Sequence, residues 1–160
     1  MFHIVDDIPE LRDVLKELIA CAGHKTMQFD SAESYLDYFN SSDFVAPIAI
    51  LSDYMMTGLT GLQLIKKVRE KAPLQKAVIV SGTPCSEFVA NIESHLCYSL
   101  TKPYKIDKLF ALLKALEECD QHCRSDSDDF PERCQYNLEH ECPFHPGKST
   151  PVKEENVRRD

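Results

Sequence analysis

The sequence predicts an α/β protein in which five strands alternate with five helices. Near-continuous apolar runs at 47–53 and 77–81 have the length and composition of strands that are buried on both faces. Between such runs, apolar residues recur at intervals of three and four, which is typical of helices with one buried face. The regular alternation of these two patterns indicates right-handed crossovers and therefore a parallel sheet.

The first part of the chain contains two strand–helix units. The strand predicted at 2–5 is a short apolar run that stops at paired acids, and helical spacing follows at 8–22. A second strand at 24–29 alternates loosely, and Asp30 or Ser31 is expected to cap the helix after it. The apolar stripe of the first helix comprises Leu11, Val14, Leu15, Leu18 and Ile19.

The alternation continues to about residue 118. Its breaks fall at residues that interrupt regular structure, because Pro73 ends a helix and Gly82 follows a strand. The elements predicted here are, in order, a strand at 47–53, a helix that includes 62–68, a strand at 77–81, a weaker helix at 86–95, a strand at 97–101 and a helix from about 106.

Five parallel strands with helices on both faces form a three-layer sandwich, for which the flavodoxin-like strand order 2-1-3-4-5 is the natural choice. In such sheets the functional site lies beyond the carboxyl ends of the strands, at the switch in strand order. Four of the predicted strands end in polar residues that would share this edge. These residues are Asp6 and Asp7, Asp53, Ser81 and Lys102.

Three carboxylates that converge on one crevice repel one another unless a cation is present. Hard oxygen ligands that leave room for water and phosphate oxygens favour Mg²⁺ over a softer metal. Asp53 ends a central strand, where its carboxylate could act as a nucleophile that accepts a phosphoryl group. Lys102 would offset the remaining negative charge.

These residues, in this order, resemble the receiver domain of two-component response regulators, here of a stand-alone type that covers residues 1–118. The resemblance implies that Asp53 is the phosphoacceptor, charged from a phosphohistidine on a sensor histidine kinase or a phosphotransfer protein. It also implies a signalling switch rather than an enzyme. The Mg²⁺ ligands that it implies are Asp6, Asp7, Asp53 and the backbone carbonyl of Met55.

The same resemblance gives roles to other residues of the predicted sheet edge. Ser81 is implied to be the hydroxyl that moves to hydrogen-bond the phosphoryl oxygen, and Lys102 is implied to be the invariant base of the family. Pro103 fits the family's cis Lys–Pro peptide, and Gly61 keeps its place after the phosphoacceptor.

The sequence departs from the family's pattern at three positions. Thr57 stands where the family often has a proline, four residues after the phosphoacceptor. Ser99 occupies the usual position of the switch aromatic, while Tyr98 and Tyr104 stand nearby. The side chain of Met55 is apolar and offers no polar help to a hydrolytic water. These departures affect the usual coupling between the hydroxyl and the aromatic residue, and they leave phosphoryl acceptance unaffected.

Several other residues with reactive side chains are expected to have structural roles alone. Cys21, Cys85 and Cys97 are interpreted as small buried side chains. His3 and His24 are interpreted as strand-edge residues.

The composition excludes some classes of partner. The net charge of -8 argues against a broad electrostatic grip on nucleic acid or on an anionic membrane. No apolar run approaches the length of a membrane span, and the acids at Asp6 and Asp7 interrupt any secretion signal. We therefore expect a cytoplasmic protein, in which thiols or metal ligation are favoured over disulfides.

Residues 119–160 differ in composition from the body of the chain. This stretch holds four of the seven cysteines and three of the six histidines, with few large apolar residues. We expect a Cys/His-rich extension at 119–146 and a flexible tail at 147–160. The candidate Zn²⁺ ligands are Cys119, Cys123, Cys134, Cys142 and His145. A reduced, disordered tail and a redox-active thiol cluster stay open as alternatives.

Two functions follow from these patterns. The leading hypothesis is a Mg²⁺-dependent phosphoacceptor whose phosphorylation on Asp53 changes a protein-interaction surface. The alternative is a phosphorylation-independent interaction module whose Cys/His tail binds metal or senses redox state. The chain after residue 118 is too short and acidic for a conventional output domain, so direct DNA binding is not expected. The downstream target and homodimerisation stay open.

Overall fold

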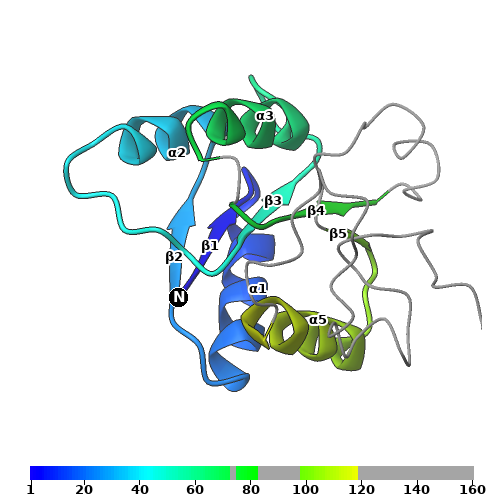
Figure 1. Ribbon diagram of the computed structural model, residues 1–160. Coiled ribbons are helices and arrows are strands. Elements are labelled where there is room, and N and C mark those ends of the chain that lie inside the picture. The colour runs from blue at the N-terminus through cyan, green and yellow to red at the C-terminus, as the bar shows by residue number, and fades with distance from the viewer. Residues whose placement is uncertain (73–74, 83–97, 119–160) are drawn as a thin grey trace, which may run out of the picture.

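The computed structural model describes residues 1–72, 75–82 and 98–118, and these form a five-stranded parallel sheet between helices (Figure 1). The strand order is β2-β1-β3-β4-β5, which confirms the predicted flavodoxin-like topology. The strands are β1 (Phe2–Val5), β2 (Thr26–Phe29), β3 (Ile50–Asp53), β4 (Ala77–Ser81) and β5 (Tyr98–Thr101).

Helices cover both faces of this sheet. In Figure 1, α2 and α3 lie together on one face, while α1 and α5 lie on the other. The helices are α1 (Pro9–Cys21), α2 (Ala32–Phe39), α3 (Gly61–Lys71) and α5 (Ile106–Glu118). The three-layer sandwich is therefore confirmed, whereas the helix predicted at 86–95 lies outside the described residues. In the described part of the chain, no helix is long and apolar enough to cross a membrane.

Two strands begin later than the apolar pattern predicts. β2 begins at Thr26 rather than at His24, because the His24 N–H donates to the Ile19 carbonyl at 3.1 Å and so completes the end of α1. Gly23, with φ at +86°, supplies the left-handed turn after that helix. β3 is predicted to begin at residue 47 but begins at Ile50, which is the first residue that pairs with β4.

Two helix ends are fixed by local hydrogen bonds. Of the two caps considered for α2, Ser31 is the one used, and its hydroxyl accepts a bond from the Ser34 N–H at 3.1 Å. Thr60 and Gln63 form a reciprocal capping box at the start of α3. The capping box fixes where the loop after β3 ends, and this loop borders the predicted site.

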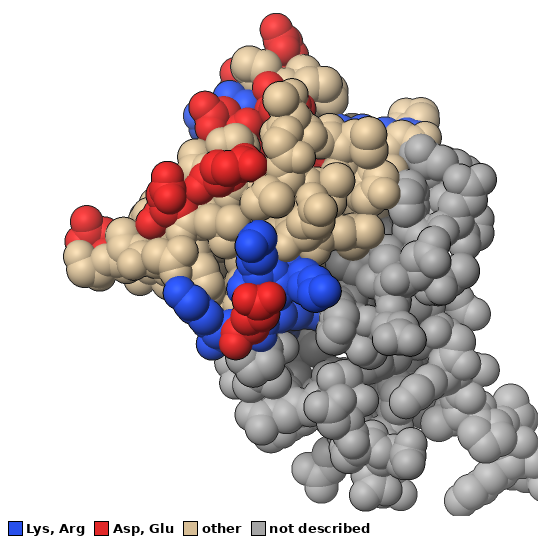
Figure 2. All heavy atoms as spheres, turned by 90° about the horizontal axis from the view of Figure 1, so that it is seen from above, with Lys and Arg blue, Asp and Glu red and all other residues tan. Residues whose placement is uncertain are grey.

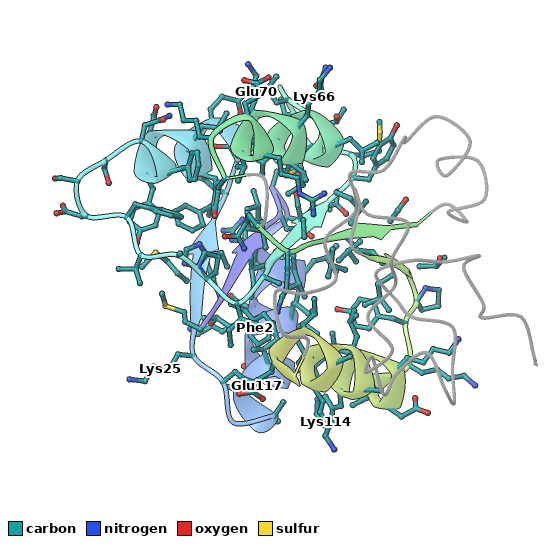
Figure 3. All side chains as sticks on the ribbon, viewed as in Figure 1. Phe2, Lys25, Lys66, Glu70, Lys114 and Glu117 are labelled. Carbon is teal, nitrogen blue, oxygen red and sulfur yellow. The ribbon has the colours of Figure 1, made fainter. Side chains whose placement is uncertain are left out.

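The sheet separates two apolar clusters, because alternate residues of each strand face opposite layers. Phe2 and Ile4 pack toward α1 and α5, whereas Val5 and Ile50 pack toward α2 and α3. Figure 3 shows Phe2 in the layer between the sheet and α5. Burial of each such side chain contributes about 1.5–3 kcal/mol, so the strands are held firmly up to their carboxyl ends.

Four side chains depart from their expected environments. His3 lies on an interior strand and is fully buried, so its interpretation as a strand-edge residue is wrong. Cys21 is exposed rather than buried. Within the predicted stripe of α1, Leu11 and Val14 are exposed, because the buried face of this helix is narrower than the stripe.

Charged side chains are segregated on the face formed by α2 and α3. Figure 2 shows a group of Lys and Arg around an acid, while the neighbouring part of this face carries mainly acids with some further Lys or Arg. Lys66 and Glu70 both project outward from α3 (Figure 3). The exposed charged residues of α3 are Lys66, Lys67, Glu70 and Lys71. Part of this face is therefore basic, although the chain as a whole carries a negative net charge.

Candidate functional site

Three carboxylates meet at the carboxyl end of the sheet. Asp6 and Asp7 follow β1, and Asp53 is the last residue of the neighbouring strand β3. One carboxylate oxygen from each of the three lies within 4.8 Å of the others. Asp6 and Asp53 are buried, with exposed fractions of 5% and 9%, and Asp7 is half-buried. The parallel register of β1 and β3 thus brings together the acids predicted from the strand ends.

Lys102 lies at the same edge and provides the opposite charge. It directly follows β5, and its N–H donates to the Ser81 carbonyl at 2.7 Å. Its Nζ donates to Asp53 Oδ1 at 2.7 Å and to Asp6 Oδ2 at 3.3 Å. The Lys102–Pro103 peptide is cis, in agreement with the resemblance. One cation therefore already contacts two of the three acids.

The surroundings of Asp53 disfavour its ionised form. Burial raises the pKa of the Asp53 carboxyl, and the charges of Asp6 and Asp7 raise it further, while Lys102 opposes both effects. Burial lowers the pKa of Lys102. The hydrogen bond and the charge of Asp53, together with those of Asp6, raise this pKa by more, so the pKa of Lys102 lies above its usual value. The lysine is thus charged at neutral pH and does not fully compensate the acids.

Hydrogen bonds from Ile8 and Arg12 help to fix the chain around Asp6. Asp6 Oδ1 accepts from the Ile8 N–H at 2.9 Å, which turns the chain into α1. The Asp6 carbonyl accepts from Arg12 Nη1 at 2.5 Å. These bonds hold the paired acids at the beginning of α1.

Asp7 is held from the opposite side of the site by Thr57. Its Oδ2 accepts from the Thr57 N–H at 2.9 Å and from the Thr57 hydroxyl at 3.3 Å. Sequence reasoning noted Thr57 only as a departure from proline and missed this contact. The signal was present, because a threonine brings an N–H and a hydroxyl that a proline lacks.

The loop between β3 and α3 passes close to Asp53. A Cβ added at Gly61 would lie 2.2 Å from the Asp53 carbonyl oxygen and 2.9 Å from Ser52 Oγ, so this position requires glycine. The Gly61 N–H donates to the Tyr54 carbonyl at 3.0 Å and closes the loop. The side chain of Met55 is 69% exposed. The expected metal ligand at this residue is its backbone carbonyl.

Ser81 lies at the same sheet edge, as predicted from the strand ends. It ends β4 and is buried, and its neighbour Val80 pairs in register with Asp53. Tyr104 is half-buried, and burial raises the pKa of its hydroxyl. Seven residues considered above lie outside the described residues. Two of them are Cys85 and Cys97, and the other five are the candidate zinc ligands Cys119, Cys123, Cys134, Cys142 and His145.

The donor set suits a hard divalent cation. Three carboxylates, of which Lys102 contacts two, leave excess negative charge at a partly buried position. Mg²⁺ prefers oxygen ligands and retains several waters, so a few carboxylates at one rim satisfy it. No cysteine or histidine belongs to this cluster within the described part of the chain, which argues against a softer metal at this position.

Comparison with known proteins gives a match over most of the chain. The family model described as the response regulator receiver domain matches residues 2–114. The DNA-binding transcriptional regulator NtrC of Klebsiella pneumoniae is 30% identical over 111 residues, which are 69% of this chain and 23% of NtrC. The transcriptional regulatory protein FixJ of Bradyrhizobium diazoefficiens is 25% identical over 127 residues, which are 78% of this chain and 60% of FixJ. The chain thus spans less than two thirds of either relative.

Solved structures share the architecture. The receiver domain of NtrX from Brucella abortus superposes with a TM-score of 0.66 and 26% identity, over 75% of this chain and all of that domain. A receiver domain protein from Clostridium thermocellum gives a TM-score of 0.65 over 72% of this chain and 91% of its own. At 16% identity, the second likeness concerns the fold alone.

Proposed function

The chain belongs to the response regulator receiver domain family, and we propose that it is a phosphoacceptor whose Asp53 receives a phosphoryl group from a phosphohistidine. The donor would be a sensor histidine kinase or a phosphotransfer protein. One observation carries the proposal. Asp53 ends a central strand, its Oδ1 lies 2.7 Å from Lys102 Nζ, and two more carboxylates lie within 4.8 Å of its own.

In the proposed reaction a carboxylate oxygen of Asp53 attacks the phosphorus atom. The new oxygen–phosphorus bond forms as the nitrogen–phosphorus bond breaks, and the electron pair leaves with the histidine nitrogen. Phosphoryl transfer of this kind needs positioning and charge stabilisation rather than further covalent help. The product is an acyl phosphate on Asp53.

Asp6, Asp7 and Asp53, with the Met55 carbonyl, would hold Mg²⁺ beside the transferred group. The cation supplies charge neutralisation for the phosphoryl oxygens when it is bound. Lys102 would keep its positive charge throughout, because its pKa is raised by the acids that it contacts. Its ammonium would then be available to a phosphoryl oxygen on Asp53.

Ser81 would report the modification to the rest of the fold. Its place at the end of β4, one residue beyond the partner of Asp53 in the sheet, supports a hydrogen bond from its hydroxyl to a phosphoryl oxygen. Movement of the backbone at Ser81 would reach Lys102, whose N–H is bonded to the Ser81 carbonyl. The surface that includes β5 and α5 would change as a result, and a partner protein would read that change.

The proposal is tested with small phosphoryl donors and mimics. Addition of beryllofluoride and Mg²⁺ should give a bound fluorine resonance in native protein, and acetyl phosphate should add one phosphoryl group by intact mass. Asp53→Asn should lose both responses, since the amide is not a nucleophile. Asp37→Asn, at an exposed acid of α2, serves as the matched control and should respond like native protein. Equal responses from Asp53→Asn and native protein would contradict the proposal.

The Cys/His-rich residues support a second proposal, that this part of the chain binds Zn²⁺ and acts as an interaction module without phosphorylation. Elemental analysis of reduced protein prepared without chelator should find stoichiometric zinc, which a Cys134→Ser/Cys142→Ser variant should lose. Native protein without zinc would contradict this second proposal. The ligand candidates are Cys119, Cys123, Cys134, Cys142 and His145.

A further inference from the structure

Asp7 is tied to the loop between β3 and α3 through Thr57. Two donors of this one residue, its N–H and its hydroxyl, converge on Asp7 Oδ2 at 2.9 and 3.3 Å. The contact spans 50 residues of sequence and joins the loop after β1 to the loop after β3. These two loops carry the proposed metal ligands Asp6, Asp7 and Met55, and the fourth, Asp53, is the last residue of β3.

The bonds from Thr57 restrain the carboxylate of Asp7 without using all of its acceptor capacity. A carboxylate has two oxygens with about four lone-pair positions, and both donors address the same oxygen. Oδ1 of Asp7 therefore retains its capacity to bind a cation while Oδ2 is held. Asp7 is only half-buried, so without these bonds its side chain would sample several rotamers.

The loop that holds Asp7 is itself well anchored. Glu33 Oε1 on α2 accepts from the Leu59 N–H at 3.1 Å, and the Gly61 N–H donates to the Tyr54 carbonyl at 3.0 Å. Gly58, with φ at +89°, turns the loop where Glu33 approaches it. Thr57 therefore joins Asp7 to a fixed support rather than to a mobile one.

We propose that Thr57 is a positioning residue for the metal site, which holds Asp7 ready to coordinate Mg²⁺ beside Asp53 and the Met55 carbonyl. This inference rests on the proposed function, because it takes Asp7 as a metal ligand. Thr57 does not contact the cation in this proposal. Its effect is to reduce the conformational freedom that Asp7 must lose on binding, and to place Asp7 relative to the loop that supplies Met55.

The bonds from Thr57 also have an effect that would lower the affinity of Asp7 for Mg²⁺. Donors on Oδ2 withdraw electron density from the carboxylate, which weakens its attraction for a cation. We expect positioning to dominate, because the donors occupy one oxygen and leave the other for Mg²⁺, and because partners of metal ligands generally strengthen binding. The sign of the measured change therefore distinguishes the two effects.

Three variants of Thr57 separate its two donors. Thr57→Ser keeps the N–H and the hydroxyl, Thr57→Val keeps only the N–H, and Thr57→Pro removes both. Thr57 is exposed, so each variant is expected to fold, and thermal unfolding followed by circular dichroism verifies this. Magnesium chloride alone is titrated into metal-free protein by calorimetry, with no phosphoryl donor present.

The Mg²⁺ dissociation constant should be unchanged in Thr57→Ser and should rise about three- to tenfold in Thr57→Pro, with Thr57→Val between them. At saturating Mg²⁺, acetyl phosphate should still modify Asp53 in every variant. In metal-free native protein, the Thr57 amide should exchange its hydrogen more slowly than in Asp7→Ala. This last readout tests the contact itself without any metal.

The outcomes separate this inference from the function on which it rests. An equal or lower dissociation constant in Thr57→Pro overturns the role of Thr57 and leaves phosphoryl acceptance standing. Thr57→Ser that binds as weakly as Thr57→Pro also overturns it, because the donors would then not be the cause. Absence of Mg²⁺ binding in native protein overturns both proposals.

Discussion

Replacement of Asp53 by asparagine should stabilise the fold when no metal is present. Asp53 is 9% exposed, and burial and the charges of Asp6 and Asp7 raise the pKa of its carboxyl, against the opposing effect of Lys102. A carboxyl whose pKa is raised by folding favours the folded state below its ordinary pKa and loses that contribution as pH rises through the folded value. At neutral pH ionised Asp53 therefore costs stability, which an uncharged amide would not.

The contact distances give the size of the effect. At an effective dielectric constant of 20, attraction to Lys102 at 2.7 Å is about 6 kcal/mol, and repulsion from each acid, which lies within 4.8 Å, is at least about 3.5 kcal/mol. Attraction and the two repulsions nearly cancel, so the desolvation of the carboxylate decides the sign. Asparagine is close in volume and keeps an oxygen that Lys102 can bond. We expect a gain of about 1–2 kcal/mol in the free energy of unfolding at pH 7.

Urea unfolding of native and Asp53→Asn protein in EDTA, followed by circular dichroism, measures this difference. The difference should shrink as pH falls toward the ordinary pKa of an aspartate and vanish below about pH 3, where the carboxyl of Asp53 is protonated in both folded and unfolded native protein. Added Mg²⁺ should stabilise native protein more than the variant. A variant that is less stable than native protein in EDTA at pH 7 would refute the reasoning, because the contact with Lys102 would then outweigh burial and repulsion.

Three further changes test other parts of the fold. Lys102→Met should destabilise metal-free protein by about 1–3 kcal/mol, since it leaves the acids without a cation. Mg²⁺ should recover part of this loss. Equal stability of the variant and native protein in EDTA would contradict the stabilising role of the lysine charge. Gly61→Ala should cost about 1–3 kcal/mol in urea unfolding because its Cβ would meet the Asp53 carbonyl. Gly82→Ala should be tolerated, because a Cβ at Gly82 meets none of the described residues within 4 Å. Burial, with the charge of the N-terminal amine, lowers the pKa of His3 to about 4, so unfolded protein binds a proton below pH 6.5 that folded protein does not. Stability should therefore fall between pH 6.5 and 4 by up to about 3 kcal/mol, and by less in His3→Gln; parallel pH profiles would contradict this.

Most of the fold was predictable because it depends on patterns that are local in sequence. Strand β4 is an uninterrupted apolar run, and the polar residues after four strands mark the edge where a parallel sheet carries its site. Asp53 and Lys102 could be assigned to this edge for the same reason, and the structure places them 2.7 Å apart.

Other features depend on tertiary contacts that no local pattern carries. His3 is buried because β1 lies between β2 and β3, and its Nδ1 lies 3.1 Å from the Tyr35 hydroxyl. Whether a polar residue of a strand faces solvent is decided by the layers that cover the sheet. Thr57 likewise meets Asp7 only after the loops of β1 and β3 come together. The two donors of Thr57 can be recognised in the sequence, but the residue that they meet is decided by the fold.

The central claim is that Asp53, rather than one of the acids beside it, carries the phosphoryl group. Protein treated with acetyl phosphate and Mg²⁺ can be reduced with borohydride, which converts an aspartyl phosphate to homoserine. Peptide mass spectrometry then locates the modified residue. We predict homoserine at position 53 in the presence of Mg²⁺, and a strong reduction when EDTA replaces it. Homoserine at Asp6 or Asp7, or none in native protein, would contradict the account.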